Sequence, residues 1–187
     1  MQEPREYKML SMLTAKSARS FVIFFSSFFY FCANVCGEAS ADQIKAAFLF
    51  NFAKYVEWDA HESWSNSDQF NFCLLINEER FVYYKALERK TINNRPISVQ
   101  LLNHDDQIAA CHVVYVSEDV PVNIMLNVQK NLNGRPVLVV SEHESHGMIE
   151  VFEEEDKIKF RVNLAAAQDA GLTFRAQMLN LAAEVVE

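Results

Sequence analysis

The sequence predicts an α/β fold: a single-domain sandwich with a mostly parallel sheet, an antiparallel C-terminal hairpin and flanking helices. Short β-branched runs alternate with helix-forming segments through the first two thirds of residues 42–187. Two of these runs, HVVYVS and VLVVS, have the continuous apolar character of strands buried on both faces, which is typical of parallel sheets. An acidic turn between two later strand-like segments indicates a hairpin. No internal repeat or long linker divides residues 42–187, so we expect one domain.

The first expected element is a helix with Asp42 as its N-cap. Its apolar positions recur at helical spacing and predict a core-facing stripe, interrupted only by Asn51, that consists of Ile44, Ala47, Phe48, Phe52 and Tyr55. Phe50 lies on the opposite face, and a helix that is apolar nearly all round is buried on more than one side. Either the C-terminal helix covers that second side, or it forms a homodimer or partner interface, where aromatic residues are enriched. Our candidate for such an interface is the aromatic flank Phe50, Tyr55 and Trp58.

The remaining elements are expected in a regular order. A polar loop at 59–68 precedes strands at 70–76, 97–102, 112–117 and 137–141. Helices are expected at 80–89 and at 121–132, the second with Gly134 as its C-cap, and residues 93–96 form a turn. The hairpin joins 149–152 to 158–162 through the acidic turn 153–156. Two helices close the chain, one at 164–170 ending at Gly171 and one at 174–186.

Residues 1–41 have the three parts of a secretory signal peptide. An apolar run spans 21–35, a small-residue stretch at 39–41 offers a cleavage site before Asp42, and four basic residues precede the run, namely Arg5, Lys8, Lys16 and Arg19. The alternative is a retained membrane anchor, but the run is shorter than the ~20 residues that a spanning helix needs. We therefore expect an exported protein with no membrane insertion after signal cleavage.

Composition excludes some partners and indicates one covalent bond. Seventeen Lys and Arg against 25 Asp and Glu give a net charge of −8, which argues against binding nucleic acid or anionic lipid. Cys32 and Cys36 lie in the predicted signal peptide, leaving Cys73 and Cys111. In an oxidising compartment we expect these two to form a disulfide; the alternative is two buried free thiols. The absence of a C-x-x-C motif argues against a redox role.

Motifs for catalysis or cofactor binding are not found in the sequence. The glycines are scattered rather than clustered as in a phosphate-binding loop, and there is no G-x-S-x-G elbow. One loop collects residues from which a hydrolase or a zinc site could be built, namely Ser141, Glu142, His143, Glu144, Ser145 and His146. Neither a triad with an orienting acid nor a four-ligand metal pattern is present, so a solvated polar loop is the simpler interpretation. We expect no enzyme activity, no catalytic residue, no metal and no cofactor.

Several blocks of this sequence resemble the YfiR-like family of periplasmic proteins. The first is IKAAFLFNFAKYVEWD at 44–59 and the second is GRPVLVVS at 134–141. The third runs from GMIE at 147–150 through the acidic turn to IKFRVNLAAA at 158–167, followed by AGL at 170–172. The blocks occur in the family's order and span nearly all of residues 42–187.

The resemblance implies a function as well as a fold. Members are small α/β proteins of the Gram-negative periplasm that tend to dimerise, and no catalytic residues are associated with them. The best-known member represses YfiN, an inner-membrane diguanylate cyclase, and so lowers cyclic di-GMP and biofilm formation. Cys73 and Cys111 match the spacing of a disulfide in that member, whereas its second cysteine pair, near 141–147, has no counterpart here.

We therefore predict a periplasmic regulatory binding protein that docks on and represses an inner-membrane signalling protein of the diguanylate cyclase class. The resemblance also implies a homodimer in solution. The alternative is a small-ligand-binding module that serves a sensor kinase or a transporter. The two hypotheses differ in one observable, because only the second requires a ligand that raises the melting temperature saturably.

Overall fold

A computed structural model describes residues 39–58, 67–103, 108–132 and 134–187, and residues 40–187 form one compact unit. The helical elements are α2 (Ala41–Tyr55), η1 (Glu78–Arg80), α4 (Phe81–Tyr84), η2 (Lys85–Arg89), η3 (Ile108–Ala110), α5 (Val122–Leu132), α6 (Leu164–Asp169) and α7 (Ala176–Leu179). The strands are β1 (Val56–Trp58), β2 (Phe70–Leu75), β3 (Thr91–Ile92), β4 (Arg95–Leu101), β5 (Val113–Val116), β6 (Leu138–Ser141), β7 (Ile149–Glu154), β8 (Lys157–Asn163), β9 (Leu172–Phe174) and β10 (Glu184–Val186). Apart from residues 39–41, the predicted signal peptide lies outside the described residues, as does most of the polar loop at 59–68.

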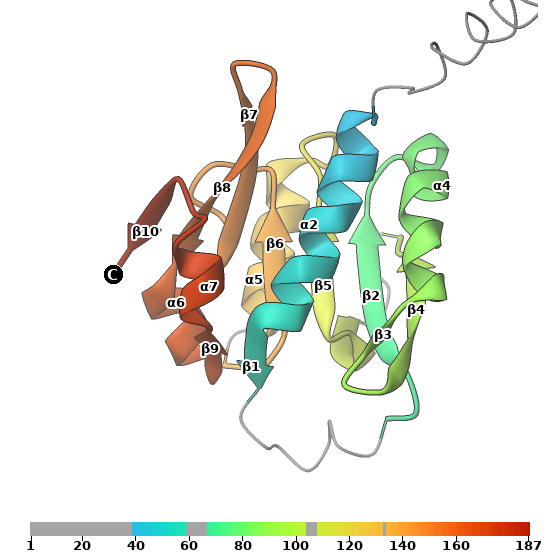
Figure 1. Ribbon diagram of the computed structural model, residues 1–187, viewed down its shortest axis with the longest axis horizontal. Helices are drawn as coiled ribbons and strands as arrows, with labels where there is room; N and C mark the ends of the chain where they lie inside the picture. The colour runs from blue at the N-terminus through green and yellow to red at the C-terminus, as the bar shows by residue number, and fades with distance from the viewer. Residues whose placement is uncertain (1–38, 59–66, 104–107, 133) are drawn as a thin grey trace, which may run out of the picture. The chain divides into compact units, whose positions relative to one another are not determined.

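The predicted α/β class is confirmed. Within the described residues an eight-stranded sheet has the order β10-β8-β7-β6-β5-β2-β4-β3, and β1 pairs with β9 in a separate two-stranded sheet. Strands β4, β2, β5, β6 and β7 are mutually parallel, whereas β7 and β8 form the predicted antiparallel hairpin. Helix α2 crosses one face of the sheet beside α4, and α5 lies behind the sheet (Figure 1). The central strands β5 and β6 are buried throughout, as expected for strands covered on both faces.

The predicted disulfide is present. Cys73 in β2 is bonded to Cys111, which lies just before β5, and both residues are buried. The bond therefore links β2 to the residue segment that leads into β5, its neighbour in the sheet.

Helix α2 packs on the sheet with the opposite face from the one predicted. The side chains buried beneath it are Lys45, Ala46, Leu49, Phe52 and Ala53. Of the predicted core stripe only Phe52 is buried; Ile44, Ala47 and Asn51 are exposed, and Phe48 and Tyr55 are half-buried. The two faces are similarly apolar, and the small Ala46 and Ala53 let the helix approach the strands closely. The N-cap is also Ser40 rather than Asp42.

The predicted C-terminal helix at 174–186 is wrong. Phe174 ends β9 and pairs with Val56, and only the short α7 is helical. Val185 and Val186 then belong to β10, which pairs in parallel with β8 at the edge of the sheet. Strand pairing by these β-branched residues outweighs the helical spacing of the apolar positions, because tertiary context readily overrides local propensity.

The tip of the β7–β8 hairpin offers a stabilising substitution. Glu155 and Asp156 have φ values of 51° and 58°, the left-handed pair of a two-residue hairpin turn that favours Asn-Gly. We expect the change Glu155→Asn with Asp156→Gly to stabilise the fold by about 0.5–1 kcal/mol, since it relieves left-handed backbone strain. Thermal unfolding measures the effect. Glycine at Glu153, in the extended strand, is the matched control and should lower the melting temperature; an equal response at both positions would contradict the turn assignment.

Candidate functional site

Five charged side chains meet at the carboxyl edge of the parallel strands. The chain leaves β2 toward β4 on one side and leaves β5 toward β6 on the other, so the sheet reverses its strand order between β2 and β5. Open α/β sheets usually bind ligands at such a switch point. Here the position is occupied by the protein itself, through a group that we call the Arg80 cluster, consisting of Asp42, Lys45, Arg80, Asp119 and Glu142.

Arg80 connects the two sides of the switch point. It follows β2 at the end of η1, and its Nη1 atom lies 2.6 Å from Oδ2 of Asp119 in the loop after β5. Its Nε and Nη2 atoms donate to Oδ1 of Asp42, in the first turn of α2, at 2.9 and 2.7 Å. The Tyr84 hydroxyl of α4 donates to the same Asp42 oxygen at 3.0 Å. One guanidinium therefore joins the start of α2 to the exits of β2 and β5.

Glu142 is the most buried carboxylate of the cluster, with only 3% of its side chain exposed. Its Oε1 atom lies 2.6 Å from Lys45 Nζ and accepts a short hydrogen bond from the Tyr115 hydroxyl. Its Oε2 atom accepts from the backbone N–H of Glu118 at 3.2 Å. Arg80 Nη2 lies 3.5 Å from the Oε1 atom of Glu142. The charge is thus paired and hydrogen-bonded, which is what a buried ion requires.

The surroundings of the cluster keep Arg80 charged and two contacting tyrosines neutral. Burial would lower the pKa of the Arg80 guanidinium, but the hydrogen bonds to Asp42 and Asp119 and the charge of Glu142 raise it above its ordinary value. Burial, followed by the charge of Glu142, raises the pKa of Tyr115 well above its ordinary range, and burial likewise raises that of Tyr84. Both tyrosines therefore stay neutral donors. These contacts engage the charged groups with one another, so the arrangement fastens α2 to the sheet rather than presenting a free base or nucleophile.

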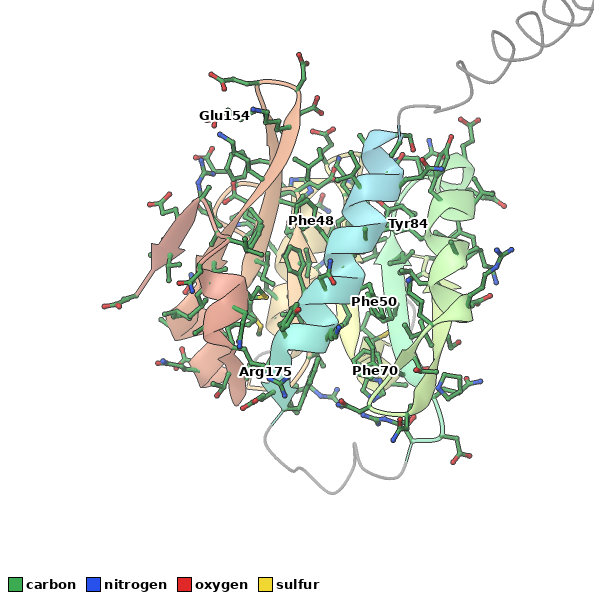
Figure 2. All side chains as sticks on the ribbon, viewed as in Figure 1. Phe48, Phe50, Phe70, Tyr84, Glu154 and Arg175 are labelled. Atoms are coloured by element: carbon green, nitrogen blue, oxygen red, sulfur yellow. A yellow bond between two sulfur atoms is a disulfide. The ribbon has the colours of Figure 1, made fainter. Side chains whose placement is uncertain are left out.

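A groove of about 630 Å³ runs beside α2 on the same face. Its apolar walls come from α2, the β7–β8 hairpin and the turn after α7, namely Phe48, Phe152, Ile158, Phe160, Leu181 and Ala183. Phe48 lies 5.7 Å from both Phe52 and Phe160, measured between ring centroids, so this wall of the groove packs against the core. Charged side chains form its rim, with Arg161 stacked over the Phe152 ring at 4.1 Å and Lys159 paired with Glu154. Figure 2 shows Phe48 on the flank of α2 that faces the hairpin.

A comparison with family models now adds to this geometry. The model described as YfiR/HmsC-like matches residues 42–183, which is most of the chain. The chain belongs to the YfiR/HmsC-like family. A comparison with curated proteins finds no match. This membership confirms the resemblance. It implies a role in the periplasmic regulation of cyclic di-GMP signalling, in a family whose proteins are regulatory rather than catalytic. Within the part of the chain that the structure describes, no helix has both the length and the apolar character to cross a bilayer.

The three aromatic residues predicted for an interface lie in α2 (Phe50 and Tyr55) and in β1 (Trp58) of this YfiR/HmsC-like protein. Phe50 points away from the groove, toward the α4 side of α2 (Figure 2), and Lys90 Nζ lies 4.8 Å from its ring. Trp58 packs edge-on against the buried Phe70 at 5.4 Å. Tyr55 lies near the end of the outward stripe of α2. All three are half-buried and packed against the core, so part of each ring is already used for folding.

The polar loop after β6 does not assemble the chemistry considered from sequence. Ser141 is buried, and its Oγ accepts from the backbone N–H of His143 at 2.9 Å. Glu142 is committed to the Arg80 cluster. Among the described residues there is no group of three or more potential His, Cys, Asp or Glu metal ligands. The Arg80 cluster was not predicted from the sequence, although one signal was available: charged residues follow shortly after β2, β5 and β6, whose ends share one edge.

Proposed function

We propose that this protein docks on the periplasmic part of an inner-membrane diguanylate cyclase and holds that enzyme in its inactive state. Family membership supports the pathway, and one structural observation supports the docking: α2 exposes Ile44 and Ala47 on its outward side, and its Phe48 lines the neighbouring groove. It represses only if it binds the inactive state of the receptor more tightly than the active state.

The proposed contact, which we call the α2 docking surface, comprises Ile44, Ala47, Phe48, Tyr55, Ile158 and Leu181. Leu181 is 74% exposed and Ile44 is 38% exposed, although each is a large apolar side chain. Lys54 is the only ionisable residue among the exposed positions of α2. Interface centres are depleted of charge in this way and are enriched in aromatic residues. Phe50 and Trp58 contribute the exposed parts of their rings to the flank of this surface.

Affinity capture from detergent-solubilised inner membranes tests the proposal. We expect the mature protein to retain a diguanylate cyclase and Leu181→Glu or Ile44→Glu to reduce capture at least tenfold, because each buries a charge at the contact. Both positions are exposed, so the melting temperature should change little. The matched control is Leu126→Glu, which replaces a leucine with glutamate at a 49% exposed position on α5. Equal capture by all three variants would reject the α2 docking surface, and capture of a kinase or transporter instead would reject the cyclase.

The groove also favours a second candidate function, the binding of a small molecule. Its volume lies within the roughly 300–1,000 Å³ typical of ligand sites, and aromatic walls with a charged rim are the usual composition of such sites. A ligand module serving a sensor kinase or transporter predicts a saturable rise in melting temperature with a small molecule. In the Phe48→Ser variant, the small molecule should no longer raise the melting temperature above that of the same variant without ligand.

The family's tendency to dimerise gives a further proposal, that two copies associate in solution. Light scattering coupled to size exclusion measures the mass directly. If the α2 docking surface also serves the dimer, Leu181→Glu should yield monomers, whereas Leu126→Glu should not.

A further inference from the structure

Helix α2 begins one residue before Asp42, the position predicted as the mature N-terminus, and its N-cap lies two residues before it. Ser40 is its N-cap: the Ser40 Oγ atom accepts from the backbone N–H of Gln43 at 3.3 Å, and the Ser40 N–H donates to Gln43 Oε1 at 3.0 Å. The Ser40 carbonyl accepts from the N–H of Ile44 at 3.1 Å. This reciprocal capping box satisfies donors that a helix start otherwise leaves unpaired. Ser40 is therefore part of the folded domain.

The sequence offers two registers for signal cleavage. Signal peptidase requires small residues at the first and third positions before the bond that it cuts. Ala39 and Ala41 place that bond between 41 and 42, as the sequence analysis predicted. Gly37 and Ala39 satisfy the same rule and place the bond between 39 and 40. Residue spacing alone does not distinguish the two.

The two cuts have different consequences for the folded chain. Cleavage after Ala41 removes the Ser40 side chain and carbonyl, and with them the capping box and the first helical hydrogen bond. It also places a new ammonium on Asp42, the residue whose carboxylate already accepts from Arg80 and Tyr84. Cleavage after Ala39 leaves the ammonium on Ser40, where it still donates to Gln43 Oε1.

We propose that signal peptidase cuts the Ala39–Ser40 bond, so that the mature chain begins on the cap of α2. Water is the second reactant: its oxygen forms the new carboxylate of Ala39, and Ser40 leaves with a free amine. A capping box removed before folding would stabilise nothing, whereas this register keeps it and the Asp42 contacts of the Arg80 cluster. The inference rests on the proposed function through its requirement for export.

Intact mass and N-terminal sequencing of the protein made from the full precursor in a Gram-negative host test the inference. We expect the periplasmic fraction to contain a chain that begins at Ser40. A chain that begins at Asp42, lighter by one serine and one alanine, overturns the inference while leaving export intact. An uncleaved precursor in the cytoplasm overturns the inference and the proposed function together.

Two substitutions separate the registers. Gly37→Leu places a bulky residue at the third position before the Ala39–Ser40 bond only, so we expect precursor to accumulate or the start to move to Asp42. Ala41→Leu blocks only the alternative bond and falls at an exposed first-turn position of α2, so the Ser40 start should be unchanged. The reverse pattern overturns the inference.

A stability comparison provides a readout that does not depend on the peptidase. Refolded chains that begin at Ser40 and at Asp42 differ by the capping box, and we expect the shorter chain to melt roughly 2–4 °C lower. Equal melting temperatures would remove the structural reason for the Ser40 start.

Discussion

Replacing Glu142 with alanine should destabilise the fold by about 3–5 kcal/mol, the usual range when one member of a buried ion pair is removed. The substitution leaves the Lys45 ammonium buried beneath α2 without its 2.6 Å partner and removes the acceptor of the Tyr115 hydroxyl. Urea unfolding of the mature protein measures the change as a lower midpoint at an unchanged slope.

Two controls identify the cause of that loss. Glu154→Ala removes an equally charged side chain from a pair that lies at the surface, and it should lower the urea midpoint far less than Glu142→Ala does. Combining Glu142→Leu with Lys45→Met removes both buried charges and should recover much of the stability, since apolar groups replace buried ion pairs at little net cost. If Glu142→Ala were no more costly than Glu154→Ala, the Arg80 cluster would not hold α2 in place.

Removing the Cys73–Cys111 disulfide should cost about 3–4 kcal/mol, the loop-entropy value for a closed loop of this length. Both residues are buried, so alanine at the two positions adds a small loss of packing. The measurement is urea unfolding of the mature protein with and without a thiol reductant. Reductant should lower the midpoint of the native protein.

The double variant supplies the control for that experiment. Cys73→Ala with Cys111→Ala should unfold slightly below the midpoint of the reduced native protein, because of the lost packing, and should not respond to reductant. A native midpoint that is unaffected by reductant, with the bond shown by mass to be open, would contradict a stabilising role for the disulfide.

The sequence was sufficient for the sheet but not for the packing of α2. Runs such as 113–116 and 137–140 are apolar throughout, and only a strand buried on both faces needs that composition, so their assignment depended on local information. The orientation of α2 could not be assigned from local information, because both of its faces are apolar and its sheet-facing side includes Lys45. That lysine is buried only because Glu142 lies opposite it, and the two are nearly 100 residues apart in the chain.

The end of the chain was mispredicted for a related reason. The apolar residues between Phe174 and Val185 fit one helical face, but Val56 and the edge of β8 provide strand partners that local spacing cannot reveal. The Arg80 cluster was missed in the same way, since its members come from α2, from η1 and from the loops after β5 and β6. The disulfide was predictable because only two cysteines follow the predicted signal peptide.

Helix α2 is fixed at both of its ends. The Arg80 cluster holds its first turn. At the other end, the carbonyl of its last residue, Tyr55, accepts a hydrogen bond from Arg175 N–H at 3.0 Å, and β1, which follows, pairs with β9. A helix anchored in this way behaves as a rigid template, so a partner that binds its outward face does not have to pay for ordering it. Such a template transmits little motion of its own. Release of a bound receptor would then depend on competition for the surface rather than on a change of shape within this protein.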